Sequence, residues 1–298
     1  MATVAPPKKK KFDAGIAQAE RVIELMEEAG NWDKPWFGNG MPFNPISKHD
    51  YRGFNVFYLE LWAMKNGYTD PRWITVKQMN EKGGKFKGNA KGKGAMISFW
   101  KPLIKPDPAN PSVNKIVGMI SRYYTVFNIE EVEGIDFPEF KRNYIDFKPV
   151  DAAEDVIKNY KGRPQILHGA THAFYAPLFH QVQMPDKKMF KSIEEYYATL
   201  FHELIHSTGH KSLLSRLDSI EYTSELGDRS KEELTAELGA SMLCGITGIK
   251  GHEKNSAAYL KNWLTAIKGD MSLLSKAGSA AQKAVDCILN TSFANEEN

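Results

Sequence analysis

The chain has 298 residues, of which 42% are hydrophobic and 25% charged, a balance typical of globular proteins with enough apolar material for two domains. Its two cysteines, Cys244 and Cys287, form no Cys-x-x-Cys pair, which argues against a disulfide framework and against a cysteine zinc site. No apolar run approaches about 18 residues and the first residues lack the apolar core of a signal peptide, so we expect a cytoplasmic protein without a membrane span.

The net charge of +3 is distributed unevenly along the chain. Residues 1–149 contain 23 lysines and arginines against 17 acids, whereas residues 150–298 contain 16 against 19. The excess is strongest over residues 45–105, with 12 basic and 4 acidic side chains. This asymmetry indicates a polyanionic partner for the first half of the chain.

The first half predicts a small α+β domain that follows a basic tail over residues 1–11. Helical spacing of apolar residues, glycine stops and runs of aromatic and β-branched residues define its elements. We expect, in chain order, a helix over 12–30, a loop over 31–53, a buried helix over 53–68, a short helix over 75–84, and strands over 95–101 and 121–129 joined by a proline-rich connection over 102–115.

The second half predicts a mainly helical domain with a small sheet, which makes the whole chain a two-domain α+β protein. We place the boundary so that the domains span 1–145 and 146–298. The expected elements of the second domain are a helix over 152–162, two strands with a tight turn over 164–185, a long helix over 192–210, another helix over 230–248, and one or two amphipathic helices over 255–290.

The long helix over 192–210 contains the motif His-Glu-x-x-His at residues 202–206. His202 and His206 lie one turn apart on the same face of a helix, so both imidazoles can reach one tetrahedral zinc ion. Glu203 follows the first of them and can reach a metal-bound water as a general base. The motif therefore predicts a metal site of the kind found in zinc peptidases.

The third ligand has several candidates. His210 is unsuitable, because it lies more than two helical turns from His202 and Gly209 is expected to end the helix. The metzincin pattern also fails, since Ser212 stands where its third histidine would be. The remaining candidates are the acids of the apolar helix that follows, where one carboxylate could bind the metal and another could accept a hydrogen bond from a ligand imidazole: Glu232, Glu233 and Glu237.

The basic first half interleaves cations with aromatic residues around a glycine-rich segment, residues 82–94. Lysines neutralise phosphates and aromatic rings stack on bases, so the pattern indicates binding of single-stranded nucleic acid. The glycines do not match the phosphate loop of ATP-binding proteins, because no Lys-Ser/Thr follows at the required spacing. The candidate DNA-binding residues are Arg52, Trp73, Lys77, Lys85, Lys87, Lys91, Lys93, Trp100 and Lys101.

The order of these parts resembles the ArdC-type plasmid antirestriction proteins. Segments that carry the resemblance include YRGFNVFYLELWAMKNGY, AMISFWK, YYATLFHELIHSTGH and EELTAELGASMLC, and the likeness runs from about residue 12 to about residue 290. It implies a DNA-binding domain for single strands, followed by a zincin-like metallopeptidase domain. It also implies that the protein protects incoming conjugative plasmid DNA from host restriction. Family members often have an aspartate where this chain has His180.

The second domain by itself resembles the gluzincin metallopeptidases. That resemblance implies that Glu233 is the third ligand and Glu237 the partner of a ligand imidazole, with zinc as the metal and manganese as an alternative. The implied reaction is hydrolysis of a peptide bond in a host protein, and Tyr175, His168 and His172 are candidates for contacts in the transition state.

Two other functions fit the same residues. One is a DNA-binding decoy whose metal site is not catalytic, and the other is a metallopeptidase whose basic loop binds an acidic protein.

Overall fold

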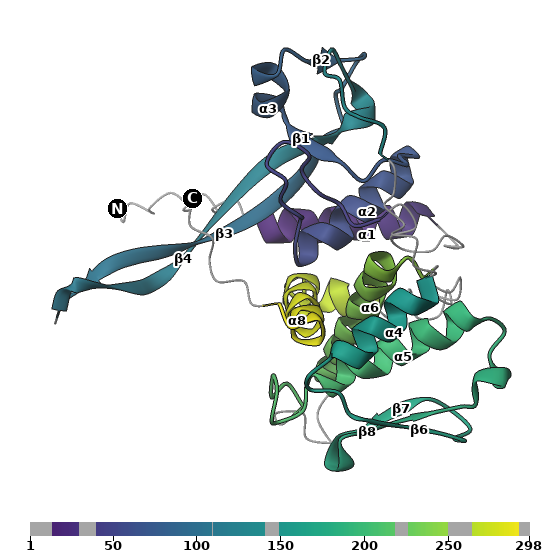
Figure 1. Ribbon diagram of the computed structural model, residues 1–298. Coiled ribbons are helices and arrows are strands. Elements are labelled where there is room, and N and C mark those ends of the chain that lie inside the picture. Colours follow the sequence, from purple (N-terminus) through teal and green to yellow (C-terminus); the bar gives the residue numbers. More distant parts are fainter. Residues whose placement is uncertain are drawn as a thin grey trace, which may run out of the picture.

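A computed structural model describes residues 14–29, 40–108, 110–140, 149–217, 226–249 and 264–291. These residues form an α+β protein with two parts, one above the other in Figure 1. The basic tail over 1–11 and the predicted domain boundary between residues 145 and 146 lie outside the described residues. The placement of that boundary therefore stays a prediction.

In the N-terminal part, helices α1 (Ala14–Ala29) and α2 (Phe54–Asn66) pack against the root of a three-stranded sheet with the order β1-β4-β3. All strand pairs in this sheet are antiparallel. A second, two-stranded sheet pairs β2 with β5 and lies beyond α3. The other bounds are β1 (Trp73–Thr75), α3 (Val76–Glu81), β2 (Lys85–Phe86), β3 (Ala95–Asp107), β4 (Asn110–Asn128), η1 (Ile129–Glu131) and β5 (Val132–Glu133).

The proline-rich connection predicted over 102–115 is wrong. Strands β3 and β4 continue through it and form a long two-stranded ribbon that projects from the body (Figure 1). Pro102 pairs with Met119 and Pro106 with Asn114 in the antiparallel register. Proline lacks an N–H donor, yet a ribbon strand has an open edge, where half of the N–H groups point to solvent. The prolines therefore do not break the pairing.

The C-terminal part consists of helices and a three-stranded sheet with the order β6-β8-β7. Sequence analysis predicted two strands with a tight turn over 164–185, whereas the structure has three strands there. β6 and β8 are parallel, and β7 and β8 are antiparallel. The bounds are α4 (Pro149–Asn159), β6 (Gln165–His168), β7 (Phe174–Ala176), η2 (Pro177–Phe179), β8 (Gln181–Met184), η3 (Lys187–Met189), α5 (Ile193–Ser207), α6 (Leu226–Thr247) and α8 (Leu273–Leu289), with further helical residues at 264–269. Within the described residues, no helix has both the length and the apolar character that a membrane crossing needs.

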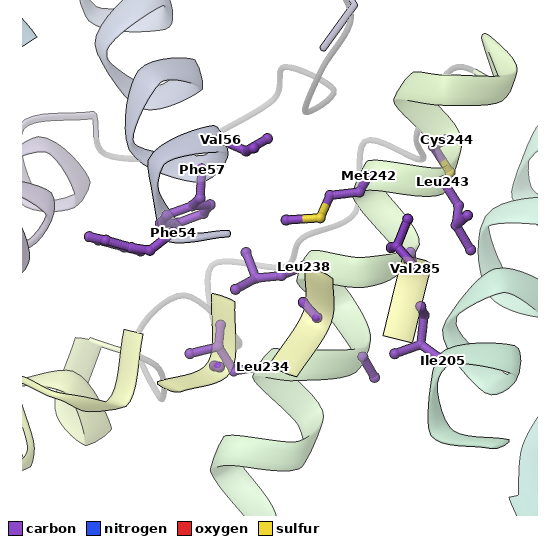
Figure 2. Close-up of a cluster of buried hydrophobic side chains, with 14 of the residues drawn as sticks. Phe54, Val56, Phe57, Ile205, Leu234, Leu238, Met242, Leu243, Cys244 and Val285 are labelled. Atoms are coloured by element: carbon purple, nitrogen blue, oxygen red, sulfur yellow. The ribbon is translucent and has the colours of Figure 1, made fainter. Parts of the chain in front are cut away.

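The two parts share one hydrophobic core. Phe54 and Phe57 of α2 belong to the same buried cluster as Leu238 and Met242 of α6 and Val285 of α8 (Figure 2). Polar contacts reinforce this interface. Arg52 forms an ion pair of 2.5 Å with Asp286, the Gly53 amide donates to Gln282 Oε1 at 3.0 Å, and Lys268 pairs with Glu27 at 2.6 Å.

Gly278 of α8 allows α2 to approach closely. A Cβ atom at this position would lie 2.9 Å from the backbone nitrogen and Cα of Phe54, too close for any side chain. Gly278→Ala should gain about 1 kcal/mol of helix propensity but lose about 1–3 kcal/mol to overpacking, so we expect a lower midpoint of urea unfolding. Gly269→Ala is the control, because no atom lies within 4 Å of the position that its methyl group would occupy. Equal midpoints for the two variants would contradict the close approach of α2 and α8.

Candidate functional site

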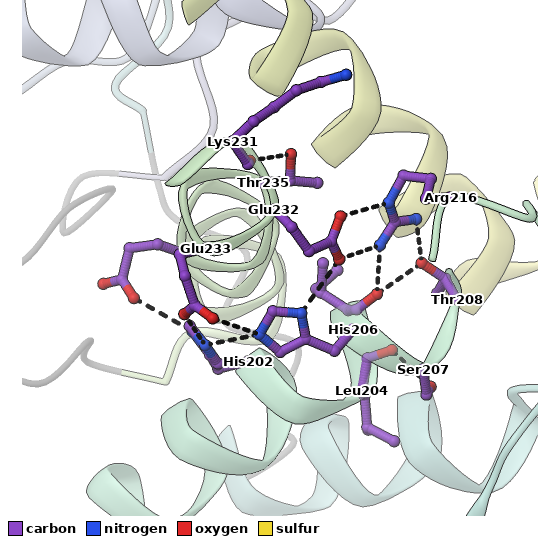
Figure 3. Close-up of polar contacts among 12 residues, drawn as sticks. His202, Leu204, His206, Ser207, Thr208, Arg216, Lys231, Glu232, Glu233 and Thr235 are labelled. Carbon is purple, nitrogen blue, oxygen red and sulfur yellow. Dashed lines mark hydrogen bonds and ion pairs between the residues drawn. The ribbon is translucent and has the colours of Figure 1, made fainter. Parts of the chain in front are cut away.

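The first turn of α5 is capped by its own sequence. The Ser192 side chain accepts a hydrogen bond from the Glu195 amide at 3.1 Å, and Glu195 Oε2 accepts one from the Lys191 amide at 2.7 Å. These contacts satisfy amide groups that have no partner within the helix. Tyr197, Phe201 and Leu204 bury the opposite side of the helix in the core. The helix thus presents His202 and His206 to its neighbour α6 (Figure 3).

Three side chains converge between α5 and α6. The Nε2 atoms of His202 and His206 lie 3.1 Å apart, and the carboxylate of Glu233 lies 3.5 Å from the first and 3.8 Å from the second (Figure 3). Two ligand atoms about 2.05 Å from a tetrahedral zinc ion would be roughly 3.3 Å apart. The spacing and the donor set of two imidazoles and one carboxylate therefore fit a divalent metal.

The other ring nitrogen of each histidine faces a second carboxylate. Nδ1 of His202 lies 3.3 Å from Glu237 Oε2, and Nδ1 of His206 lies 3.1 Å from Glu232 Oε1. A carboxylate in this position accepts a hydrogen bond from Nδ1–H and leaves Nε2 free for a metal. Glu233 therefore lies near both Nε2 atoms, whereas Glu237 and Glu232 each lie near one Nδ1 atom.

Arg216 joins this arrangement from the segment that follows α5. Its guanidinium donates two hydrogen bonds to the carboxylate of Glu232, at 2.9 and 3.0 Å. It also donates to Thr208 Oγ1 at 2.8 Å and to the Ile205 carbonyl at 2.9 Å (Figure 3). This two-pronged pairing occupies Glu232, which sequence analysis left open as a metal ligand. No motif pointed to Arg216, because its role depends on how the chain turns after α5.

The charges in this cluster are strongly coupled. Burial by itself would lower the pKa of His202, but the carboxylates of Glu233 and Glu237 outweigh burial and raise the pKa to about 10. The hydrogen bond with His202 holds the pKa of Glu233 below its usual range. Burial opposes ionisation of Glu232, yet His206 and Arg216 keep its pKa low as well. The site is therefore rich in negative charge and attracts a positive partner, either protons or a metal ion.

Glu203 is 8% exposed and follows His202 on α5. No described residue donates a hydrogen bond to its carboxylate, which leaves it available to a bound water. The candidates for transition-state contacts are engaged elsewhere. His168 Nε2 lies 3.0 Å from the Tyr196 hydroxyl, His172 bonds Thr171, and the Tyr175 hydroxyl lies 2.8 Å from Nδ1 of His180.

Two of the five lysines in the glycine-rich segment 82–94, called the lysine-rich loop below, are paired with acids. Lys85 lies 3.3 Å from Glu133 and Lys93 lies 3.1 Å from Glu131. These acids lie outside the basic window 45–105 in sequence, but the chain around β5 brings them back beside the loop. Lys77 pairs with Glu81 at 3.7 Å, while Lys87 and Lys91 are exposed.

Two of the predicted DNA-binding residues have structural environments that remove them from a binding surface. Trp73 is 1% exposed and packs against Tyr68, so its ring has no face for a base. Arg52 is held by Asp286 at the junction of the two parts. Lys101 is exposed on β3; Trp100 precedes it on this strand, and its side chain lies outside the described structure.

Comparison with known proteins divides the chain in the same way. Residues 15–127 match the family of the N-terminal domain of anti-restriction factor ArdC, and residues 151–280 match the zincin-like metallopeptidases. The Mn(II)-bound crystal structure of the antirestriction ArdC protein from plasmid R388 superposes with a TM-score of 0.73 at 31% identity, covering 96% of this chain and all of that one. The chain belongs to the ArdC antirestriction family. The metal-free form of the R388 protein superposes with a TM-score of 0.71, also at 31% identity, and covers 94% of this chain.

ArdC-like sequence also occurs within longer proteins. A DNA primase TraC of Escherichia coli is 34% identical over 304 residues, which include 94% of this chain. This chain spans about a quarter, 27%, of that primase. The uncharacterized protein y4eC of Sinorhizobium fredii (strain NBRC 101917 / NGR234) is 29% identical over 89% of this chain and 88% of its own length.

Arg216→Ala should leave the buried carboxylate of Glu232 with His206 alone. Because both partners are largely buried, we expect the free energy of unfolding to fall by about 3 kcal/mol, measured by urea titration. Arg163→Ala removes an exposed arginine from the same part of the molecule and should change it by less than about 0.5 kcal/mol. Equal effects of the two substitutions would show that the guanidinium does not hold Glu232.

Proposed function

We propose that this chain is an antirestriction protein that binds single-stranded DNA with its N-terminal part and one divalent metal ion, zinc, between His202, His206 and Glu233. The observation that carries the metal assignment is the convergence of one ligand atom from each of His202, His206 and Glu233 within 4.8 Å of one another, with the two Nε2 atoms 3.1 Å apart. Membership of the ArdC family supports the antirestriction role. The Mn(II) bound by the R388 protein keeps manganese as the alternative metal.

The proposed reaction is hydrolysis of a peptide bond in a host protein. A bound divalent ion would polarise the carbonyl group and acidify water. Glu203 then accepts the proton of the attacking water as general base and passes it to the leaving amine. Glu237 and Glu232 keep the two imidazoles in the orientation that directs Nε2 toward the ion. We place the boundary between the DNA-binding and peptidase domains at residues 145 and 146.

Metal content distinguishes the ligand from its partner. Glu233→Ala removes a ligand, so the purified variant should contain little metal. The molar ratio of metal to protein is measured by elemental mass spectrometry after acid digestion. Glu237→Ala removes only the partner of His202 Nδ1 and should weaken binding by about 10- to 100-fold, so that metal returns at higher concentration. Metal retained in the Glu233 variant and lost in the Glu237 variant would reverse the assignment.

Glu203→Gln tests whether catalysis contributes to antirestriction. The substitution preserves side-chain volume and all three ligands, so metal content should stay at the wild-type level. Loss of the general base should slow hydrolysis by about 10²- to 10⁴-fold, and protection of plasmid DNA transferred into a restricting host should fall with it. Full protection by the metal-loaded variant would favour the decoy function over a peptidase.

A further inference from the structure

The ribbon formed by β3 and β4 leaves the body of the protein after a firmly anchored root (Figure 1). Gln18 Nε2 donates to the Met96 carbonyl at 2.7 Å, and Asn55 exchanges two hydrogen bonds with the Ser98 backbone, at 2.6 and 3.0 Å. Ala95 and Ile97 are buried beneath the helices. The direction in which the ribbon projects is therefore fixed by its contacts with α1 and α2.

Beyond Ser98 the ribbon exposes an unusual number of large apolar side chains. Exposing apolar surface to water is unfavourable in free energy, and large exposed apolar patches usually mark binding sites. The ribbon is therefore expected to bind a partner. The side chains concerned are 39–60% exposed and include Phe99, Ile104, Val113, Ile116, Val117, Ile120, Tyr123 and Tyr124.

The charge of the ribbon indicates that this partner is an anion. Residues 95–128 contain four basic side chains and a single acid, Asp107, which pairs with Lys115 at 2.6 Å. Lys101, Lys105 and Arg122 are exposed, and among the described residues no carboxylate lies within ion-pair distance of them. This contrasts with the lysine-rich loop, where Glu131 and Glu133 neutralise two of the lysines.

The register places rings and cations side by side on one face. Phe99 is directly opposite Arg122, Ile97 is opposite Tyr124, and Lys101 is opposite Ile120. Opposed residues share a face, so Phe99, Lys101, Arg122 and Tyr124 form a single surface, here called the ribbon face. Successive residues on this face are about 7 Å apart along each strand, which puts a cation beside each ring.

We propose that the ribbon face binds single-stranded DNA, with Phe99 and Tyr124 stacking on bases while Lys101 and Arg122 contact phosphates. A base offers its flat face to an aromatic ring only when it is unstacked, so the two rings favour single strands over a duplex. A duplex would engage the two cations alone. This inference rests on the proposed function that the N-terminal part binds DNA, and it assigns the contact to the ribbon instead of the lysine-rich loop.

Paired charge variants of the full chain test the assignment. Lys101→Gln with Arg122→Gln removes two cations from the ribbon face, and Lys85→Gln with Lys93→Gln removes two from the loop as a matched control. Binding of a fluorescent 20-nucleotide oligothymidine is followed by anisotropy over a range of salt concentrations. The ribbon variant should lose at least about tenfold in affinity, and its salt slope should fall by about 1.4, whereas the loop variant should change less than threefold.

Aromatic variants test stacking separately from charge. Phe99→Ala with Tyr124→Ala should weaken binding at least about tenfold without changing the salt slope. Tyr124→Phe retains the ring and should bind like the wild type. Because these side chains are exposed, each variant should unfold at the wild-type temperature, which is measured alongside.

The outcomes separate this inference from the function on which it rests. Absence of wild-type binding at low salt would overturn both. Wild-type binding that is lost in the loop variant but retained in both ribbon variants would overturn only the ribbon assignment. Equal affinity of the wild type for a duplex of the same length would overturn the stacking argument. A change of oligomeric state in the aromatic variant, with unchanged DNA affinity, would make the ribbon a protein interface and overturn the proposal.

Discussion

Helix α6 packs against the hydrophobic core on one side and faces the histidines of α5 on another. The arrangement of the molecule depends on this double contact. Leu234, Leu238 and Met242 recur every fourth residue and fill the core shared with α2 and α8 (Figure 2). Glu233 and Glu237 have the same spacing one position earlier and face the histidines of α5. Because protein interiors are densely packed, the apolar contacts on one side of α6 determine where the Glu233 carboxylate lies on the other.

The three acids in the cluster between α5 and α6 differ in their surroundings. A carboxylate that is mostly withdrawn from water needs a cation or hydrogen-bond donors, and Arg216 supplies these to Glu232. Glu237 has the imidazole of His202 as its neighbour. Glu233, with half of its side chain exposed, is the least enclosed of the three. The acid with the greatest access to solvent is also the one that lies near both Nε2 atoms, as expected of a group that accepts an incoming ion.

Sequence patterns predicted those features that depend on local spacing. The helices that carry His202 and Glu233 follow from apolar periodicity, and the pairing of His202 with His206 follows from the four-residue helical repeat. Features that depend on distant parts of the chain could not be predicted in this way. Arg216 reaches Glu232 only after a turn, and Glu131 meets Lys93 only through β5. Composition likewise could not show that Trp73 is buried.

The ribbon shows how a compositional rule can mislead. Prolines usually mark connections, but they are tolerated on an open strand edge, and β3 and β4 have such edges along most of their length. Runs of aromatic and β-branched residues were present on both sides of the supposed connection. Only the pairing of Pro102 with Met119 and of Pro106 with Asn114 shows that the strands continue.

Because α2, α6 and α8 share one core, we expect that a gene segment encoding only one part of the protein would not give a stable product. Separating the two parts would expose Phe54 and Phe57 on one side and Leu238 and Met242 on the other, at about 1.5–3 kcal/mol for each side chain. A gene fusion or recombination event that carried only one part would therefore yield a fragment with these apolar side chains exposed. We expect such a fragment to fold poorly and to aggregate. The alignment with the much longer TraC primase extends over both parts. Both parts also occur together in the R388 protein, even though two separate family models describe them.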